Sequence, residues 1–149
     1  MTHHEKNTAT ILHLSALSQY LIPFGNYIVP TIIWSAKKNT SEYVDQNGKN
    51  ILNFQLSVFL YSIVLLLIAI PTLLYGLLKN TNLDLLINTN HHFEIVNSAH
   101  LSSFIITLAI VGFLFAALKI AEFILIIIGA VAASNGDSYK YPLTLNFIK

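Results

Sequence analysis

The amino-acid sequence predicts an all-α fold: a polytopic helical membrane protein with three membrane helical regions, or four if the last one breaks. Hydrophobic residues make up 54% of the 149 residues and charged residues only 10%, whereas soluble domains carry about 25% charged residues. Most apolar residues lie in three long stretches, each exceeding the roughly 20 residues with which a helix crosses a hydrocarbon core. We therefore expect a single helical membrane domain, residues 1–149, whose surface faces lipid.

The first membrane region, at about residues 11–36, is expected to be broken at residues 23–26. Pro23 and Pro30 each remove a backbone donor and disfavour helix at the residue before them. Broken backbone at membrane depth survives only where protein or a water-filled cavity satisfies the freed polar groups. Two arrangements remain open. Either one kinked helix spans the membrane, or two half-helices form a re-entrant hairpin.

The second membrane region, at about residues 51–78, contains no charge between Lys49 and Lys79. At about 1.5 Å per residue it would extend about 42 Å, so it must tilt, bend or protrude, and Pro71 is the expected bend. A polar loop, residues 37–50, precedes it, with Ser41 or Asp45 as a possible cap for an amphipathic lead-in. Residues 79–98 follow as an extramembrane insertion whose apolar side chains rest on the membrane interface.

The third membrane region, at about residues 99–133, would be about 54 Å long as one straight helix, counted from Ser98. It must protrude from a hydrocarbon core of about 30 Å or break near Gly112. Lys119 and Glu122 lie within it, three residues apart, which is the spacing of an ion pair on one helix face.

Lysine positions predict the orientation of the chain. The first loop has Lys37, Lys38 and Lys49 and the tail has Lys140 and Lys149, whereas the second loop has only Lys79. We therefore expect the first loop and the C-terminus in the cytoplasm. The N-terminus lies outside if the first region spans the membrane and inside if it is re-entrant.

Three segments carry a resemblance to a known family: HLSALSQYLIPFGNYIVPTIIW, YVDQNGKNILNFQLS and GDSYKYPLTLNFIK. They resemble the small bacterial Tic-twenty-like integral membrane proteins, a family of unknown function. The resemblance implies a helical, multi-pass protein of the bacterial inner (cytoplasmic) membrane and implies no reaction. Relative to that family, residues 72–111 look like an insertion.

The first region, with its break, supplies the first candidate site residues, which are His13, Pro23, Gly25, Asn26 and Pro30. Broken helices mark substrate sites in transporters, but they also serve as packing devices in which a glycine allows close approach and an asparagine bonds a neighbouring helix. Asn53 and Gln55 lie on different faces of the second helix and are expected to bond across to the first region, as polar contacts between helices.

Two further groups of residues are candidates. Lys119 and Glu122 are either a proton or ion relay, because ionisable residues deep in a membrane are expensive, or a pair close to the outer interface. Aromatic and basic side chains are expected at headgroup depth as interfacial anchors, namely Trp34, Tyr139, Lys140 and Tyr141.

Several function classes find no support in the sequence. The chain has no cysteine, its six histidines fit no metal motif, and no nucleophile elbow, phosphate-binding loop or dinucleotide fingerprint is present. A net charge of +1 without a basic stripe argues against nucleic acid. We therefore expect no cofactor, no metal and no catalytic site.

The function expected from these features is a non-enzymatic small integral membrane subunit. It would pack with itself or as an accessory component of a larger membrane complex, in transport or secretion for example, because short spans with polar positions need neighbours in lipid. The alternative is a small channel or carrier for protein, an ion or a small solute.

Overall fold

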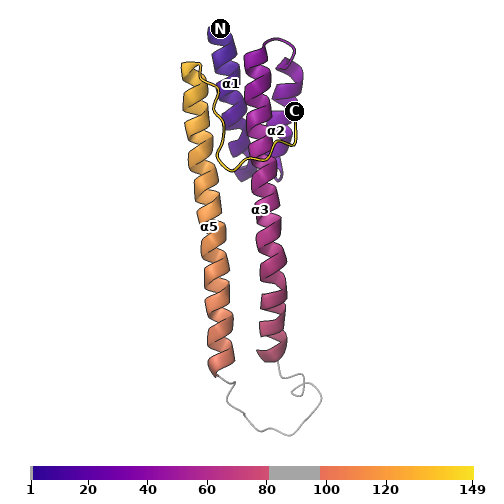
Figure 1. Cartoon of the computed structure of the whole chain (residues 1–149), viewed down its shortest axis with the longest axis vertical. Coiled ribbons are helices and arrows are strands. Elements are labelled where there is room, and N and C mark those ends of the chain that lie inside the picture. Colours follow the sequence, from indigo (N-terminus) through magenta and orange to yellow (C-terminus); the bar gives the residue numbers. More distant parts are fainter. Residues whose placement is uncertain (1, 81–97) are drawn as a thin grey trace. The chain divides into compact units, whose positions relative to one another are not determined.

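The described residues are 2–80 and 98–149 of a computed structural model, with side chains for residues 2–75 and 105–149. Every element in these residues is a helix, in agreement with the predicted all-α class (Figure 1). The elements are α1 (His3–Ser15), the 3-10 helix η1 (Ala16–Tyr20), α2 (Gly25–Lys37), α3 (Glu42–Asn80) and α5 (Ser98–Asn135). The insertion expected at residues 79–98 lies almost wholly outside the described residues.

The chain divides into two compact units. The first unit comprises Met1–Leu60 and Leu118–Lys149, and the second comprises Tyr61–Ala117. The first unit therefore holds α1, η1, α2, the beginning of α3, the end of α5 and the non-helical tail. The second unit holds the remaining parts of α3 and α5. A single domain stays a prediction.

Two helical segments among the described residues are long and apolar enough to cross a membrane. They are Glu42–Tyr75, with 34 residues, and Ile105–Asn135, with 31 residues, and only 17% and 11% of their most apolar windows are buried within the chain. A core helix of a soluble protein would be mostly buried, so these faces need an apolar surrounding. The three or four spans expected from the sequence are not confirmed, because α1 and α2 have 13 residues each, or about 20 Å.

The first region forms a helical hairpin. Helix α1 begins with a capping box, in which Thr2 Oγ1 accepts a hydrogen bond from the Glu5 amide and Glu5 Oε2 accepts one from the Thr2 amide. The helix tightens into η1 after Ser15, and α2 then packs back against η1 and α1 (Figure 1). The region is thus two short helical arms rather than one kinked helix.

The chain reverses direction at residues 21–24. Phe24 adopts the left-handed conformation with a φ of 60°, and Gly25 starts α2 so close to η1 that a Cβ there would lie 2.6 Å from the Ser18 carbonyl oxygen. The break predicted at residues 23–26 is therefore present but shifted to residues 21–24, because η1 ends at Tyr20 and Gly25 and Asn26 are already helical. Pro30 is buried inside α2 without ending it.

Helix α3 begins earlier than expected, and the polar loop before it is correspondingly shorter than residues 37–50. Glu42 and Asp45 occupy its first turn, where acidic side chains complement the helix dipole. Asp45 also pairs with Lys49 at 2.6 Å, four residues on. The helix continues through Pro71, and α5 continues through Gly112 without the break considered for it.

The core of the first unit joins η1, α3, α5 and the tail. Its buried residues are Ala16, Ile51, Phe54, Val58, Ile126 and Tyr141. The Tyr141 ring stacks on Phe54 with centroids 4.2 Å apart. The Tyr139 ring meets Tyr141 edge-on at 4.9 Å. The tail thus contributes a central core residue and holds α3 and α5 in one unit.

Candidate functional site

Polar side chains are concentrated in the interior of the first unit. Those that are buried are His13, Asn26, Asn47, Asn53, Gln55, Ser57 and Glu122. A buried polar group costs free energy unless it is hydrogen-bonded, so the partners of these residues decide what the site can do. They fall into three groups: one around His13, one that binds the tail, and one at the hairpin turn.

The first group is centred on His13. Its Nε2 lies 2.9 Å from Asn47 Oδ1, and its Nδ1 lies 2.7 Å from the Tyr141 hydroxyl. Asn47 Nδ2 donates to the Tyr43 carbonyl, which fixes the amide so that its oxygen faces the imidazole. His13 Nε2 therefore carries the proton and donates, while Nδ1 accepts from the Tyr141 hydroxyl.

This arrangement holds His13 neutral. The imidazole is fully buried, and burial lowers its pKa, with the Asn47 hydrogen bond opposing that effect in part. Burial likewise raises the pKa of the Tyr141 hydroxyl. His13 belongs to α1, outside the two segments that could span a membrane. Its role here is to connect α1, α3 and the tail through uncharged hydrogen bonds.

The second group fastens the tail to α3. Asn53 Oδ1 accepts from the amides of Phe147 (3.1 Å) and Ile148 (2.8 Å), and its Nδ2 donates to the Ile148 carbonyl at 3.0 Å. Ser57 Oγ accepts from the Leu145 amide at 2.9 Å. Asn50 Nδ2 donates to the Tyr139 carbonyl at 2.9 Å. One face of α3 thus supplies the partners that an extended tail requires.

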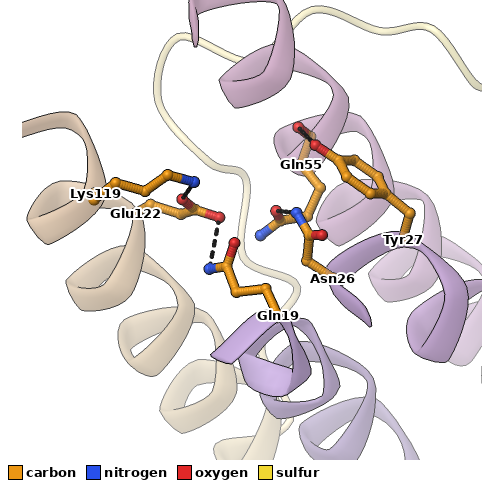
Figure 2. Close-up of polar contacts among 6 residues, drawn as sticks. All are labelled: Gln19, Asn26, Tyr27, Gln55, Lys119 and Glu122. Atoms are coloured by element: carbon orange, nitrogen blue, oxygen red, sulfur yellow. Dashed lines mark hydrogen bonds and ion pairs between the residues drawn. The ribbon is translucent and has the colours of Figure 1, made fainter. Parts of the chain in front are cut away.

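The third group lies at the hairpin turn and is drawn in Figure 2. Asn26 Nδ2 donates to Gln55 Oε1 at 2.7 Å, and the Tyr27 hydroxyl donates to the Gln55 carbonyl at 3.3 Å. Glu122 accepts from Gln19 Nε2 at 3.1 Å and from Lys119 Nζ at 2.8 Å. Figure 2 shows the side chains of both sets of contacts, and the ion pair of Lys119 and Glu122 comes from α5.

Two features of this third group are chemically unusual. The Glu122 carboxylate is fully buried, whereas the Lys119 side chain is 34% exposed, so the anion depends on a partner that still reaches the surface. Gln55 Nε2 is a buried donor with no hydrogen-bond partner among the described residues. An unpaired buried amide is uncommon and can bind a hydrogen-bond acceptor.

The candidate residues from the sequence do not all come together. Gln55 bonds the first region as expected, through Asn26, whereas Asn53 bonds the tail instead. The lysine and glutamate of α5 do pair. Gly25 allows α2 to approach η1 closely, because it has no Cβ to meet Ser18. Pro23 lies in the turn.

The expected interfacial anchors occupy different environments. Trp34 is half-buried, and its Nε1 donates to Asp45 Oδ1 at 2.8 Å; a Cβ at Gly48 would overlap its indole ring. Lys140 is exposed and Tyr139 half-buried. Tyr141 lies in the core against Phe54 and His13.

Sequence reasoning overlooked Gln19, Tyr43, Asn47 and the tail-binding role of Asn50 and Ser57. One signal was available: residues 50, 53 and 57 follow a helical spacing, so their polar side chains share one face of α3. Nothing local indicated that the tail would return to that face. Within the residues whose placement is known, no group of three or more acidic, histidine or cysteine side chains could hold a metal ion.

Helices with apolar exposed faces around an interior of mostly hydrogen-bonded polar groups are typical of a small helical membrane protein. The chain belongs to the magnetosome magnetite crystal formation protein family (MamF/MmsF), whose family model matches residues 4–148. No curated protein and no solved structure gives a significant match.

This membership corrects the resemblance drawn from the sequence motifs. The chain is not a Tic-twenty-like protein, because the matching family model is the magnetosome one. The match also runs through residues 72–111, which the earlier comparison treated as an insertion. The misleading signal has a physical basis: apolar helices with proline and glycine breaks are shared by many unrelated membrane proteins.

Proposed function

We propose that this chain is a non-enzymatic, small integral membrane subunit that contributes to magnetite crystal formation at the magnetosome membrane. It would act by packing with copies of itself or as an accessory component of a larger membrane complex. The observation that carries the proposal is the family match over residues 4–148 together with two long helices whose apolar faces are not covered within the chain.

The distribution of polarity supports a packing role. Buried polar side chains bond chiefly to one another or to the backbone of the first unit, which gives that unit a fixed shape. Its exposed large side chains include apolar ones on α2 and α5, such as Ile32 at 63% and Ile120 at 61%. Such faces suit lipid chains and neighbouring membrane helices, where van der Waals packing drives association.

The proposed setting is a bacterial inner membrane, or a magnetosome membrane of equivalent sidedness, crossed more than once. The C-terminus and the α2–α3 turn would face the cytoplasm, because the lysines of the chain are concentrated there. The lipid bilayer is then the first partner, and a second membrane protein or a second copy is the other.

Purification in mild detergent tests the subunit role. We expect light scattering to give a mass above that of the 16.6 kDa chain, or mass spectrometry to identify a stoichiometric membrane partner. A lone monomer without a co-purifying protein would overturn this part of the proposal.

Deletion of the gene in its native host tests the magnetite role separately. We expect electron microscopy to show smaller or fewer crystals, restored by the wild-type gene. A host that forms no magnetite, or crystals unchanged by the deletion, would overturn the role in crystal formation and leave the subunit role standing.

A small channel or carrier is the second candidate function, and the group at the hairpin turn favours it. Glu122 is a buried carboxylate in a helix that could span a membrane, and Gln55 Nε2 of the same group is a buried donor without a hydrogen-bond partner among the described residues. Cysteine substitutions at Gln19 and Glu122, which bond one another at the hairpin turn, should then react with water-soluble maleimides, and Glu122→Gln should reduce flux. Complete protection of both positions would exclude a water-filled path there.

A further inference from the structure

One end of the first unit gathers the starts of α1 and α3 and the end of α5. Lys6 Nζ donates to the Asn135 carbonyl at 2.9 Å. The Tyr43 hydroxyl donates to the Ala133 carbonyl at 2.8 Å. The first turns of α1 and α3 therefore lie beside the last turn of α5, and Figure 1 shows the N-terminus at this end.

The hairpin turn lies at the other end of the unit. Its Gln19 and Asn26 bond Glu122 and Gln55, respectively. Gln55 is twelve residues beyond Tyr43 along α3, which is about 18 Å at about 1.5 Å per residue. Because the chain reverses at this turn and α2 packs back along α1 and η1, both arms of the hairpin begin and end on the same side of the turn.

The surface of the turn is apolar. Leu21, Ile22 and Phe24 are 86%, 53% and 66% exposed. No charged residue lies between Lys6 and Lys37, and the one histidine in that stretch, His13, is buried. Hydrocarbon is the surrounding that such a turn fits, because exposing these side chains to water would cost about 25 cal/mol per Å².

The backbone of the turn is also suited to lipid. The amides of Leu21 and Ile22 donate to the Ser18 carbonyl, and the Gly25 amide donates to the Ile22 carbonyl. In the first turn of α2, the amides of Tyr27 and Ile28 donate to the Phe24 carbonyl. Internal hydrogen bonding of these amides lowers the cost of placing the turn in a membrane.

We propose that α1, η1 and α2 form a re-entrant hairpin whose turn, residues 21–24, inserts among the acyl chains of one leaflet. The N-terminus then stays on the same side of the membrane as the α2–α3 turn and the C-terminal tail. This inference rests on the membrane placement of α3 and α5 and is independent of any role in magnetite formation.

Cysteine labelling tests the sidedness, since the native chain has no cysteine. The exposed positions His3, Asn39 and Lys140 would each be changed to cysteine in the full chain. A membrane-impermeant maleimide should leave all three positions unlabelled in intact spheroplasts and should label all three once the membrane is permeabilised, because they share the cytoplasmic side. Labelling of His3→Cys from the side opposite to Asn39→Cys would show that the first region spans the membrane and would overturn the hairpin.

Fluorescence quenching tests whether lipid acyl chains surround the turn at residues 21–24. The full chain with Phe24→Cys, carrying a fluorescent label, would be reconstituted in liposomes containing spin-labelled acyl chains. We expect at least twofold quenching, and little for the matched control Asn39→Cys. Absence of quenching by lipid at Phe24, or quenching only by a spin-labelled second copy of the chain, would overturn acyl chains as the occupant.

Discussion

At the scale of single residues, His13 shows how an uncharged imidazole connects three segments. It donates to Asn47 and accepts from Tyr141 in a site without solvent access. Each partner is itself fixed, the amide by a backbone carbonyl and the tyrosine by stacking on Phe54. The residue therefore stabilises one particular arrangement of α1, α3 and the tail.

Acid should destabilise the first unit through His13. Because burial lowers the pKa of His13 in the folded chain, the unfolded chain binds its proton more readily. The stabilisation is fully present above the unfolded value of about 6.5 and is lost as the pH falls below it toward the folded pKa. We expect the thermal midpoint in detergent to drop between pH 7.5 and pH 5. His13→Asn should be less stable at pH 7.5 and lose most of this pH dependence, whereas an unchanged slope would contradict the assignment.

Two glycines of α5 form a matched pair for testing core packing. A Cβ at Gly129 would overlap the Tyr141 hydroxyl, which is held by His13, whereas a Cβ at Gly112 meets nothing within 4 Å. Gly129→Ala should lower the free energy of unfolding by about 1–3 kcal/mol through overpacking. Gly112→Ala should leave it equal or raise it by about 0.5–1 kcal/mol. Denaturant titration in micelles measures both, and equal effects would argue against the tail being seated on α5.

We expect substitutions of Lys119 and Glu122, the ion pair of α5, to have coupled effects on stability. Lys119→Met would leave the buried Glu122 carboxylate with Gln19 as its one remaining partner among the described residues, and an uncompensated buried charge is strongly destabilising. Adding Glu122→Gln should restore much of the lost stability, since no charge then remains. Thermal midpoints of the two single variants and the double variant measure this coupling. Additive effects would show that the pair is not the reason for the loss.

At the scale of elements, the tail acts as a strap because α3 presents its amide and hydroxyl groups to an extended backbone. Asn53 alone makes three hydrogen bonds to residues 147 and 148. The tail beyond α5 forms no helix or strand, and these contacts and the Tyr141 ring fasten it to α3. A strap of this type is lost as a unit when its central anchor is removed.

Asn53→Ala should therefore release the end of the tail. Each lost hydrogen bond contributes about 0.5–1.5 kcal/mol, so amide exchange at Leu145, Phe147 and Ile148 should accelerate about tenfold or more. Hydrogen exchange with mass spectrometry resolves this peptide. Gln46→Ala, at an exposed position of the same helix, serves as control and should leave the exchange unchanged. Equal exchange in both variants would contradict the strap.

At the scale of the whole molecule, the outward faces decide where the chain resides. The long helices have apolar exposed side chains, such as Leu67 at 66% and Phe113 at 73%. Such side chains are more stable in hydrocarbon than in water. We expect the chain to remain in the membrane pellet after washing with carbonate at high pH and to be released only by detergent. Recovery in the supernatant would overturn the membrane placement on which the hairpin depends.

The sequence by itself determined the helical class, the apolar faces, the interruption near Pro23 and the pairing of Lys119 with Glu122, because each follows from composition or from spacing within one helix. Tertiary structure alone decided that the interruption is a hairpin turn, that Asn53 binds the tail, and that Tyr141 is a core residue. Those outcomes depend on contacts such as Lys6 with Asn135 and His13 with Tyr141, more than 120 positions apart. Such pairings leave no periodic signal, since they arise only when distant segments compete to satisfy the same buried polar groups.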